Sequence, residues 1–210
     1  MTALQEGMRG LLASRRRELD RGAAPVGWKI GINVEAVQAR LGLDGPVVGH
    51  LTSAGLVEDG AVVRVGRWAN PMLEPEVAIR VGADGAPAGL APAIELVDID
   101  IPLEDLEQIL RRNVFHRNVI LGAETTAGAP ERVRCEVALA GEVMATADAP
   151  FDAREVVSYV SGFLERHGAE LHPGDWIIAG SLTTPAALTA AGRVEVSISD
   201  LGRVAVGVEI

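Results

Sequence analysis

The sequence has little cysteine and few aromatic residues. Its 210 residues include one cysteine, Cys135, and aromatic side chains make up 3% of the chain. One cysteine excludes an intramolecular disulfide and a metal site built from several thiolates, so a bound metal would need oxygen or imidazole ligands. The scarcity of aromatic side chains argues against stacking platforms for single-stranded nucleic acid and predicts an aliphatic core.

Positive charge and long apolar runs are also scarce. The chain has 19 basic and 29 acidic residues, a formal net charge of −10, which repels phosphate backbones and anionic membrane surfaces at long range. Apolar runs such as residues 91–97, which contain Glu95, are far shorter than the roughly 20 residues that span a bilayer. We therefore expect neither a nucleic acid nor a membrane as a partner.

The amino terminus lacks the order of a secretory signal. In residues 1–22 the basic cluster follows the apolar residues, and Glu6, Glu18 and Asp20 lie among them. A signal peptide instead begins with positive charge and continues into an apolar stretch. We expect a cytoplasmic location.

Several common catalytic motifs are missing as well. The sequence contains no GxSxG, no glycine-rich phosphate loop, no HExxH and no EF-hand spacing. Each of these motifs places specific groups around a nucleophile, a phosphate or a metal. Serine-hydrolase chemistry and nucleotide binding therefore have no support.

The composition fits one globular domain. Hydrophobic residues make up 48% and charged residues 23% of the chain, a balance typical of folded proteins, and this length can bury one sizeable core. We predict an N-terminal helical segment over residues 1–26 and a single α+β domain over residues 27–210, with several antiparallel strands.

Hydrophobic periodicity assigns the elements. A helical period predicts helices at residues 3–20, 34–41, 103–112 and 153–167, with Asn33 and Asp152 as N-caps of the second and the last. Period-two alternation predicts strands at residues 25–33, 61–65, 73–81, 93–98, 119–121, 133–139, 142–146, 176–179, 193–199 and 203–210. Residues 42–59 are interrupted by Gly and Pro and are predicted as a loop that could contain a short strand.

Three glutamates could form a cation site. Glu74 and Glu76 are two apart in a predicted strand, so both carboxylates project from one face, about 6.5 to 7 Å apart at the backbone. Glu95 lies inside an apolar run, where an acid is seldom buried without a cation, a partner or a raised pKa. Oxygen ligands suit hard divalent cations. The same patterns also fit a strand with a solvent-facing side and a glutamate at a strand edge, and both interpretations stay open.

Lys29 and two histidines are candidates for proton transfer. Gly27 and Gly31 flank Lys29 in a predicted strand and would let a ligand or another backbone approach closely. A partly desolvated lysine has a lowered pKa and can transfer protons, although most strand lysines reach solvent. His116 lies between a predicted helix and a predicted strand and is the most plausible titrating imidazole, with His50 second, although a histidine is more often structural.

A polar segment follows the strand predicted at residues 176–179. Ser181 and Thr183 lie in it, and hydroxyl or backbone N–H groups there could bind a carboxylate. A plain Gly-Ser turn has the same composition. The residues alone leave both interpretations open.

Seven separated segments resemble a known family in sequence and in order. They are GWKIG (27–31), VQARLGLDGPVVGHL (37–51), EDG (58–60), PMLEPEVA (71–78), PAIELVD (92–98), EVVSYVSGFLERHG (155–168) and GDWIIAGSLTTP (174–185). The set resembles the 2-keto-4-pentenoate hydratase and 4-oxalocrotonate decarboxylase branch of the fumarylacetoacetate hydrolase superfamily, from residue 27 to residue 210. An ordered set is far more specific than any one segment. The resemblance implies a mixed, largely antiparallel β-sheet roll with flanking helices, a Mg²⁺ or Mn²⁺ ion, a small 2-oxo acid substrate and a homo-oligomer.

The resemblance also implies roles for individual residues. The family's metal carboxylates fall on Glu74, Glu76 and Glu95, its active-site lysine falls on Lys29, and its 2-oxo acid pocket falls on residues 180–183, with Ser181 and Thr183. Gly31, beside the lysine, would also face the substrate. The implied reaction is hydration of a 2-hydroxydienoate, in which the metal stabilises developing enolate charge and Lys29 relays a proton along the π-system.

Two departures from the family pattern leave the reaction open. Val47 stands where hydratases of the family carry an acid that helps activate water, and the decarboxylase branch tolerates an apolar residue there. His116 and Arg117 stand near where a pocket-lining segment is expected, and we hypothesise that His116 acts as an acid or base and that Arg117 binds a second substrate carboxylate. Hydration, decarboxylation of a 4-oxalocrotonate or oxaloacetate type, acylpyruvate C–C hydrolysis and a non-catalytic binding role all remain as interpretations.

Overall fold

The computed structural model describes residues 2–126, 128 and 130–210. Met1, the first residue of the predicted N-terminal segment, lies outside them. The helices in this part of the chain are α1 (Ala3–Asp20), α2 (Glu35–Leu41), α3 (Leu106–Arg111) and α4 (Ala153–Arg166). No helix among the described residues is long and apolar enough to cross a membrane.

Both long helices form where the periodicity predicts them. In α1, Met8 and Leu11 lie on the buried stripe, and the Thr2 hydroxyl accepts the backbone N–H of Gln5. The helix α4 begins after Asp152, whose carboxylate accepts backbone N–H groups of the first turn. Side-chain capping of this kind satisfies donors that a helix leaves free at its start.

The strands form two sheets. The larger sheet contains β1 (Pro25–Gly31), β2 (Val47–Thr52), β3 (Leu56–Val57), β5 (Pro71–Val81), β6 (Pro87–Asp98), β7 (His116–Leu121), β10 (Trp176–Ile178) and β11 (Ala186–Ala187). Its strand order is β2-β1-β10-β5-β6-β7-β3, with β11 paired to β5. The smaller sheet contains β4 (Val62–Arg64), β8 (Arg132–Leu139), β9 (Glu142–Pro150), β12 (Gly192–Ile198) and β13 (Gly202–Glu209), in the order β4-β13-β12-β8-β9.

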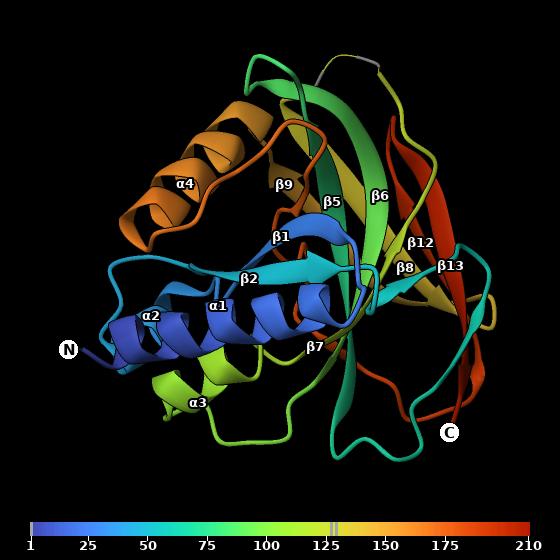
Figure 1. Cartoon of the computed structure of the whole chain (residues 1–210). Helices are drawn as coiled ribbons and strands as arrows, with labels where there is room; N and C mark the ends of the chain where they lie inside the picture. The colour runs from blue at the N-terminus through green and yellow to red at the C-terminus, as the bar shows by residue number, and fades with distance from the viewer. Residues whose placement is uncertain (1, 127, 129) are drawn as a thin grey trace.

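Most strand pairs are antiparallel, and β1–β10, β3–β7 and β4–β13 are the parallel pairs among the described residues. The predicted mixed, largely antiparallel architecture is confirmed. Figure 1 shows the helices gathered on one side of the large sheet and the five-stranded sheet on the other. The large sheet is curled. Three strands separate β1 from β7 in the sheet order, yet Lys29 of β1 contacts Val114 beside β7.

Three local predictions are corrected. Asn33 does not cap α2, whose N-cap is Val34; its side chain instead donates to the Ser181 carbonyl. The helix predicted at 103–112 begins only at Leu106, because Asp105 caps it. The predicted loop 42–59 contains β2, a strand whose six residues are all buried and which therefore lacks the alternation that marks a half-exposed strand.

The core is aliphatic, as predicted. It fills the space between the two sheets and under the helices, with Met8 of α1, Val77 of β5 and Val196 of β12 in one continuous cluster. The polar residues buried within this fold are few, and they include Lys29, Glu76 and Glu95. Because burying unpaired charge is costly, these three residues mark the place where the fold supports chemistry.

Candidate metal centre

Three glutamates meet on one face of the large sheet. Glu74 and Glu76 lie on β5, and Glu95 lies on β6 directly opposite Glu74. Directly paired residues, and residues two apart on a strand, point to the same side. One carboxylate oxygen from each lies within 4.8 Å of the others. Neither Glu76 nor Glu95 is on a solvent-facing side, since both side chains are fully buried.

Each buried carboxylate has one oxygen held and one oxygen unpartnered. Glu76 Oε2 accepts the backbone N–H of Gly180 at 2.8 Å, and Glu95 Oε1 accepts from Lys29 and contacts His116 Nδ1 at 2.7 Å. Among the described residues, Glu76 Oε1 and Glu95 Oε2 have no hydrogen-bond partner. Buried oxygens without a donor are costly, and a hard cation fits this all-oxygen donor set.

The electrostatics of the cluster favour a cation. Burial and the neighbouring Glu95 charge raise the pKa of Glu74 to about 7, with Lys29 opposing this. Burial and the charges of Glu95 and Glu74 raise the pKa of Glu76 well above its ordinary value. Burial also opposes ionisation of Glu95, but Lys29 and His116 outweigh it and lower the pKa of Glu95 to about 2. Glu74 and Glu76 therefore resist ionisation until positive charge is added.

The Lys29 side chain is buried beside these carboxylates. It is 1% exposed, so it does not reach solvent as most strand lysines do. Its ammonium donates to Glu95 Oε1 and to the Val114 carbonyl, the latter at 3.1 Å. Lysine has three N–H donors, so these two acceptors leave one donor for a third group.

The segment before β7 has an unusual backbone. Asn113, Val114 and Phe115 have φ values of 53°, 53° and 64°, a left-handed conformation that side chains with a Cβ rarely adopt. The Asn113 side chain accepts the His50 N–H and donates to the His50 carbonyl, both at 2.8 Å. This conformation aims the Val114 carbonyl at Lys29.

The two candidate histidines lie in different environments. His116 Nδ1 contacts Glu95, and Nε2 has no partner among the described residues. His50 is buried on β2 beside Glu18, with its Nε2 3.4 Å from Glu18 Oε2. Burial, partly offset by Glu18, lowers the pKa of His50 to about 4, so His50 is neutral near pH 7. Both line one cavity of about 300 Å³.

The predicted binding residues Ser181, Thr183 and Gly31 lie in two places. Ser181 Oγ donates to the Thr183 carbonyl at 2.8 Å, and Thr183 Oγ1 donates to the Thr184 carbonyl at 3.0 Å, in the segment that begins with the Gly180 contact to Glu76. Gly31 packs so closely against Val114 that an added Cβ would lie 2.7 Å from Val114 Cγ1.

Arg117 is committed to other groups. Its guanidinium lies 3.0 Å from Asp98 and 3.2 Å from Asp100. A role for Arg117 in binding a substrate carboxylate would require one of these ion pairs to open. The arginine therefore stays a predicted substrate contact, whereas Lys29 and His116 already contact Glu95.

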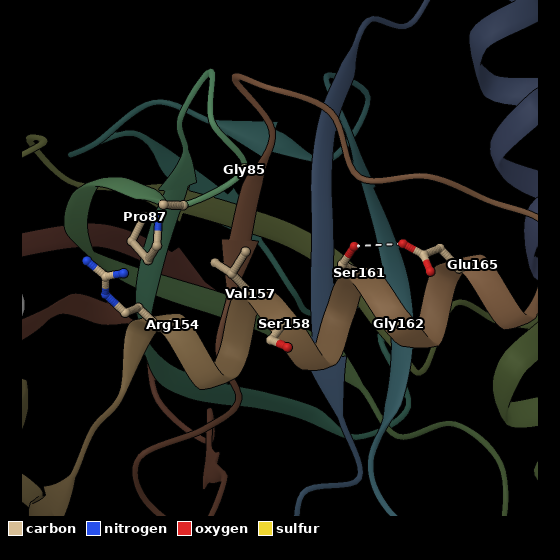
Figure 2. A pocket seen from close by; sticks show the side chains of 9 residues that line it. Gly85, Pro87, Arg154, Val157, Ser158, Ser161, Gly162 and Glu165 are labelled. Carbon is tan, nitrogen blue, oxygen red and sulfur yellow. Dashed lines mark hydrogen bonds between the residues drawn. The ribbon is translucent and has the colours of Figure 1, made fainter.

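A larger surface cavity lies apart from this cluster. It has a volume of about 480 Å³ and lies between α4 and the turn that joins β5 to β6 (Figure 2). Arg154, Ser158, Ser161 and Glu165 are among its lining residues, with Ser161 hydrogen-bonded to Glu165. None of the predicted site residues is in that lining, so the candidate centre rests on the buried carboxylates and not on this cavity.

Sequence reasoning missed the roles of Asn113 and Val114. In this segment the sequence points only to His116 and Arg117. An asparagine followed by Val-Phe carries no signal for three residues with positive φ. The segment is held by local backbone bonds to the end of α3 and by long-range bonds to Asp98 and His50. The Gly180 N–H contact to Glu76 agrees with the idea that backbone groups of that segment bind a carboxylate, but the carboxylate is the protein's own.

Comparisons with known proteins give sequence relatives and fold neighbours of this chain. No protein-family model matches the chain. It is 31% identical to 2-keto-4-pentenoate hydratase 1 of Dechloromonas aromatica, over 90% of this chain and 80% of the relative. It is 26% identical to a 4-oxalocrotonate decarboxylase of a Pseudomonas species, over 94% of this chain and 82% of the relative.

Solved structures share the fold. The 4-oxalocrotonate decarboxylase of Pseudomonas putida G7, complexed with magnesium and adipate, matches with a TM-score of 0.84 and 20% identity, covering 95% of this chain and 83% of that one. A fumarylpyruvate hydrolase of Pseudomonas aeruginosa, with Mn²⁺ and pyruvate, matches with a TM-score of 0.70 and 19% identity, covering 89% and 90%.

The curled mixed sheet with its flanking helices is the fumarylacetoacetate hydrolase fold. The chain belongs to this superfamily, in the branch that contains the 2-keto-4-pentenoate hydratases and 4-oxalocrotonate decarboxylases. It is therefore an enzyme of a metal-dependent superfamily. This confirms the family that the ordered segments predict.

Proposed function

We propose that the chain is a divalent-metal-dependent lyase that acts on a small 2-oxo acid, with hydration of a 2-hydroxydienoate as its reaction. The observation that carries this proposal is the cluster of Glu74, Glu76 and Glu95 beside the buried Lys29. Its two unpartnered carboxylate oxygens suit a cation and a chelating substrate. The names of the relatives in the same branch support the substrate class.

Glu74, Glu76 and Glu95 would hold Mg²⁺ or Mn²⁺, since all-oxygen sites accept both. When bound, the ion supplies Lewis-acid stabilisation of the negative charge that develops on the substrate's 2-oxygen. The protein's contribution is to hold two of the carboxylates rigidly. Gly180 fixes Glu76 through its N–H, and Lys29 and His116 fix Glu95.

We assign proton transfer to Lys29. Two of its donors are fixed by Glu95 and Val114, so the remaining N–H can serve the substrate. A buried group close to the reacting atoms can hold and return a proton without reorganising water. His116 is the second candidate acid or base. The polar segment with Ser181 and Thr183 is the candidate site for the substrate carboxylate. Gly31, which lies beside Lys29, and Arg117 are further candidate contacts to the substrate.

Decarboxylation of a 2-oxo acid is the second candidate function, and one observation favours it. Val47 pairs with Gly31, and Gly49 pairs with Lys29. Paired residues, and residues two apart on a strand, point to the same side of a sheet, so Val47 faces the same side as Lys29. It is fully buried. A valine there cannot activate water, whereas loss of CO₂ needs only enolate stabilisation and a proton donor.

Turnover of a substrate panel tests the proposal. The purified protein is assayed by ultraviolet absorbance with 2-hydroxydienoates, 2-oxo-enedioates, acylpyruvates and oxaloacetate, with Mg²⁺ or Mn²⁺ and with EDTA as the control. Metal-dependent loss of a 2-hydroxydienoate chromophore without CO₂ supports hydration, and consumption of a 2-oxo-enedioate or of oxaloacetate with stoichiometric CO₂ supports decarboxylation. Cleavage of an acylpyruvate would instead favour the hydrolase, and no turnover with the metal bound would overturn the lyase proposal.

We also propose a cytoplasmic homo-oligomer. The strand β9 lies at an edge of the smaller sheet and exposes Val143 and Met144, which are 57% and 41% exposed. An exposed apolar edge strand favours association. Light scattering coupled to size-exclusion chromatography measures the mass in solution, and a mass of 22.0 kDa would contradict the oligomer.

A further inference from the structure

The left-handed segment 113–115 is held by backbone hydrogen bonds to α3 and β6 and, on its β2 side, by the side chain of Asn113. Val114 is β-branched, and a β-branched residue with positive φ is a genuine outlier. Asn113 tolerates this backbone better than most residues. Its side-chain amide also bonds to both the N–H and the carbonyl of His50. Because β2 is at the edge of the sheet, these are backbone groups that a neighbouring strand would otherwise bond.

The close approach of Asn113 to β2 requires Gly49. An added Cβ at Gly49 would lie 2.8 Å from Asn113 Oδ1 and 2.8 Å from Lys29 Cγ. Gly49 is also the residue that pairs with Lys29 between β1 and β2. Asn113, Gly49 and Lys29 therefore pack against one another as one unit.

This packing affects the hydrogen bonds of the Lys29 ammonium. The Val114 carbonyl follows directly from the anchored Asn113 and accepts from Lys29 Nζ at 3.1 Å. Glu95 Oε1 accepts a second N–H and also contacts His116. Two fixed acceptors determine the direction of the third N–H of an ammonium. With one acceptor, the torsions of the lysine side chain could move Nζ about the single remaining hydrogen bond, and the third N–H would move with it.

We propose that Asn113 is a positioning residue that orients the Lys29 ammonium through the Val114 carbonyl. Its part in turnover rests on the proposed function, in which Lys29 transfers the proton. Asn113 itself contacts the backbone of β2 and not the carboxylate cluster, so its loss acts on orientation and leaves the three glutamates in place.

The sequence offers an unusually clean probe, because Lys29 is the only lysine in the chain. Protein labelled with ¹⁵N-lysine therefore gives a single side-chain ammonium signal by NMR. The variant Asn113→Gly keeps a backbone that accepts positive φ and removes both hydrogen bonds to His50. Asn113→Asp keeps the acceptor for the His50 N–H and removes the donor to the His50 carbonyl.

The matched control is Asp200→Gly. Asp200 also has positive φ, 64°, in the turn between β12 and β13, and it lies outside the site. We expect Asn113→Gly to shift or broaden the Lys29 signal and to lower kcat by roughly 10- to 100-fold, with KM and Mn²⁺ affinity kept. Asn113→Asp should fall between, and Asp200→Gly should change neither the signal nor kcat.

The two arms separate the possible failures. An unchanged Lys29 signal in folded Asn113→Gly would overturn the positioning role, whatever the activity. A changed signal with unchanged kcat per folded molecule would also overturn it, because orientation would not matter to turnover. A wild-type protein without turnover would overturn the proposed function alone, and the NMR arm would still decide whether Asn113 orients Lys29. Should Asn113→Gly not fold, Asn113→Asp is measured in the same way.

Discussion

Lys29 and Glu95 form an ion pair in which the side chains are 1% and 0% exposed. The pair joins β1 to β6, which are not neighbours in the sheet. Glu95 Oε2 remains unpartnered within the described chain. The pair therefore connects the proton-transfer candidate to the carboxylate cluster through a single residue.

Removal of Lys29 should affect both stability and activity. Lys29→Met leaves Glu95 as an uncompensated buried charge, and breaking such a pair costs about 3–5 kcal/mol. Turnover should fall by about 10²- to 10⁴-fold, the usual worth of a positioned acid or base. Urea denaturation in EDTA and steady-state kinetics measure the two effects.

The double variant Lys29→Met/Glu95→Gln is the control for the stability effect. It removes the uncompensated charge and should unfold at a higher urea concentration than Lys29→Met. A Lys29→Met protein that keeps wild-type kcat would contradict the proton-transfer role, and one that keeps wild-type stability would contradict the importance of the ion pair.

Glu76→Gln should weaken metal binding. The amide oxygen can still accept the Gly180 N–H, so the fold is retained, but the anionic oxygen is lost and Mn²⁺ affinity should fall by roughly tenfold or more. Titration followed by electron paramagnetic resonance measures free Mn²⁺ directly. Glu195→Gln, at a surface ion pair with Arg203, is the matched control and should bind Mn²⁺ as the wild type does. Equal affinity in both variants would argue against the glutamate site.

The stability of the metal-free protein should depend on pH through Glu74. Its pKa is raised to about 7 from an ordinary value of 4.5, so the folded state holds its proton more tightly than the unfolded state. This contribution to stability is complete below the ordinary pKa and is lost as pH rises through about 7. Glu95 has the opposite sign: its pKa is lowered to about 2, and its contribution is lost as pH falls toward that value.

Metal ions should reverse the loss at high pH. A cation binds the ionised carboxylates, so the rise in Tm caused by Mg²⁺ should be larger at about pH 8 than at about pH 5.5. Differential scanning fluorimetry with Mg²⁺ and with EDTA measures both. A Tm shift that is equal at the two pH values, or larger at the lower one, would show that these carboxylates are not the ligands.

Replacement of His116 tests its role as an acid or base. His116→Gln should lower kcat at saturating substrate by about 10²-fold, because a glutamine cannot exchange a proton with Glu95 or the substrate. His167→Gln, at the end of α4, is the control and should keep kcat. Unchanged kcat in His116→Gln would assign the contact with Glu95 to structure alone.

Gly49→Ala should disturb the site without a change of charge. The added Cβ would press on Lys29 Cγ and on Asn113 Oδ1, each 2.8 Å away, and a displaced lysine should lower kcat by roughly tenfold or more. Gly162→Ala in α4 is the control (Figure 2). Its Cβ would lie 3.4 Å from Arg166 Nη1, and the better helix propensity should stabilise the protein by up to about 1 kcal/mol. Wild-type kinetics in Gly49→Ala would show that the site tolerates the displacement.

The elements with strong periodicity were predictable from the sequence. Helix α1 occupies the residues that its apolar stripe predicts, and β8 and β9 contain the strands predicted at residues 133–139 and 142–146. The sequence allows a short strand within residues 42–59 but does not place β2, because a strand buried on both faces has no alternation. The cap of α2 was missed because Asn33 bonds to Ser181, which is distant in the sequence.

The sequence by itself determined the family and the residue types of the site, because ordered motifs and a two-residue spacing of glutamates can be recognised without the structure. Only the tertiary structure decided which carboxylate oxygens are unpartnered, that Lys29 is buried against Glu95, and that Arg117 pairs with Asp98 and Asp100. It also decided that the Asn113 side chain bonds to His50, which lies on β2 and is distant in the sequence. Burial and long-range hydrogen bonds depend on how strands curl together in space, and local residue patterns carry no record of that.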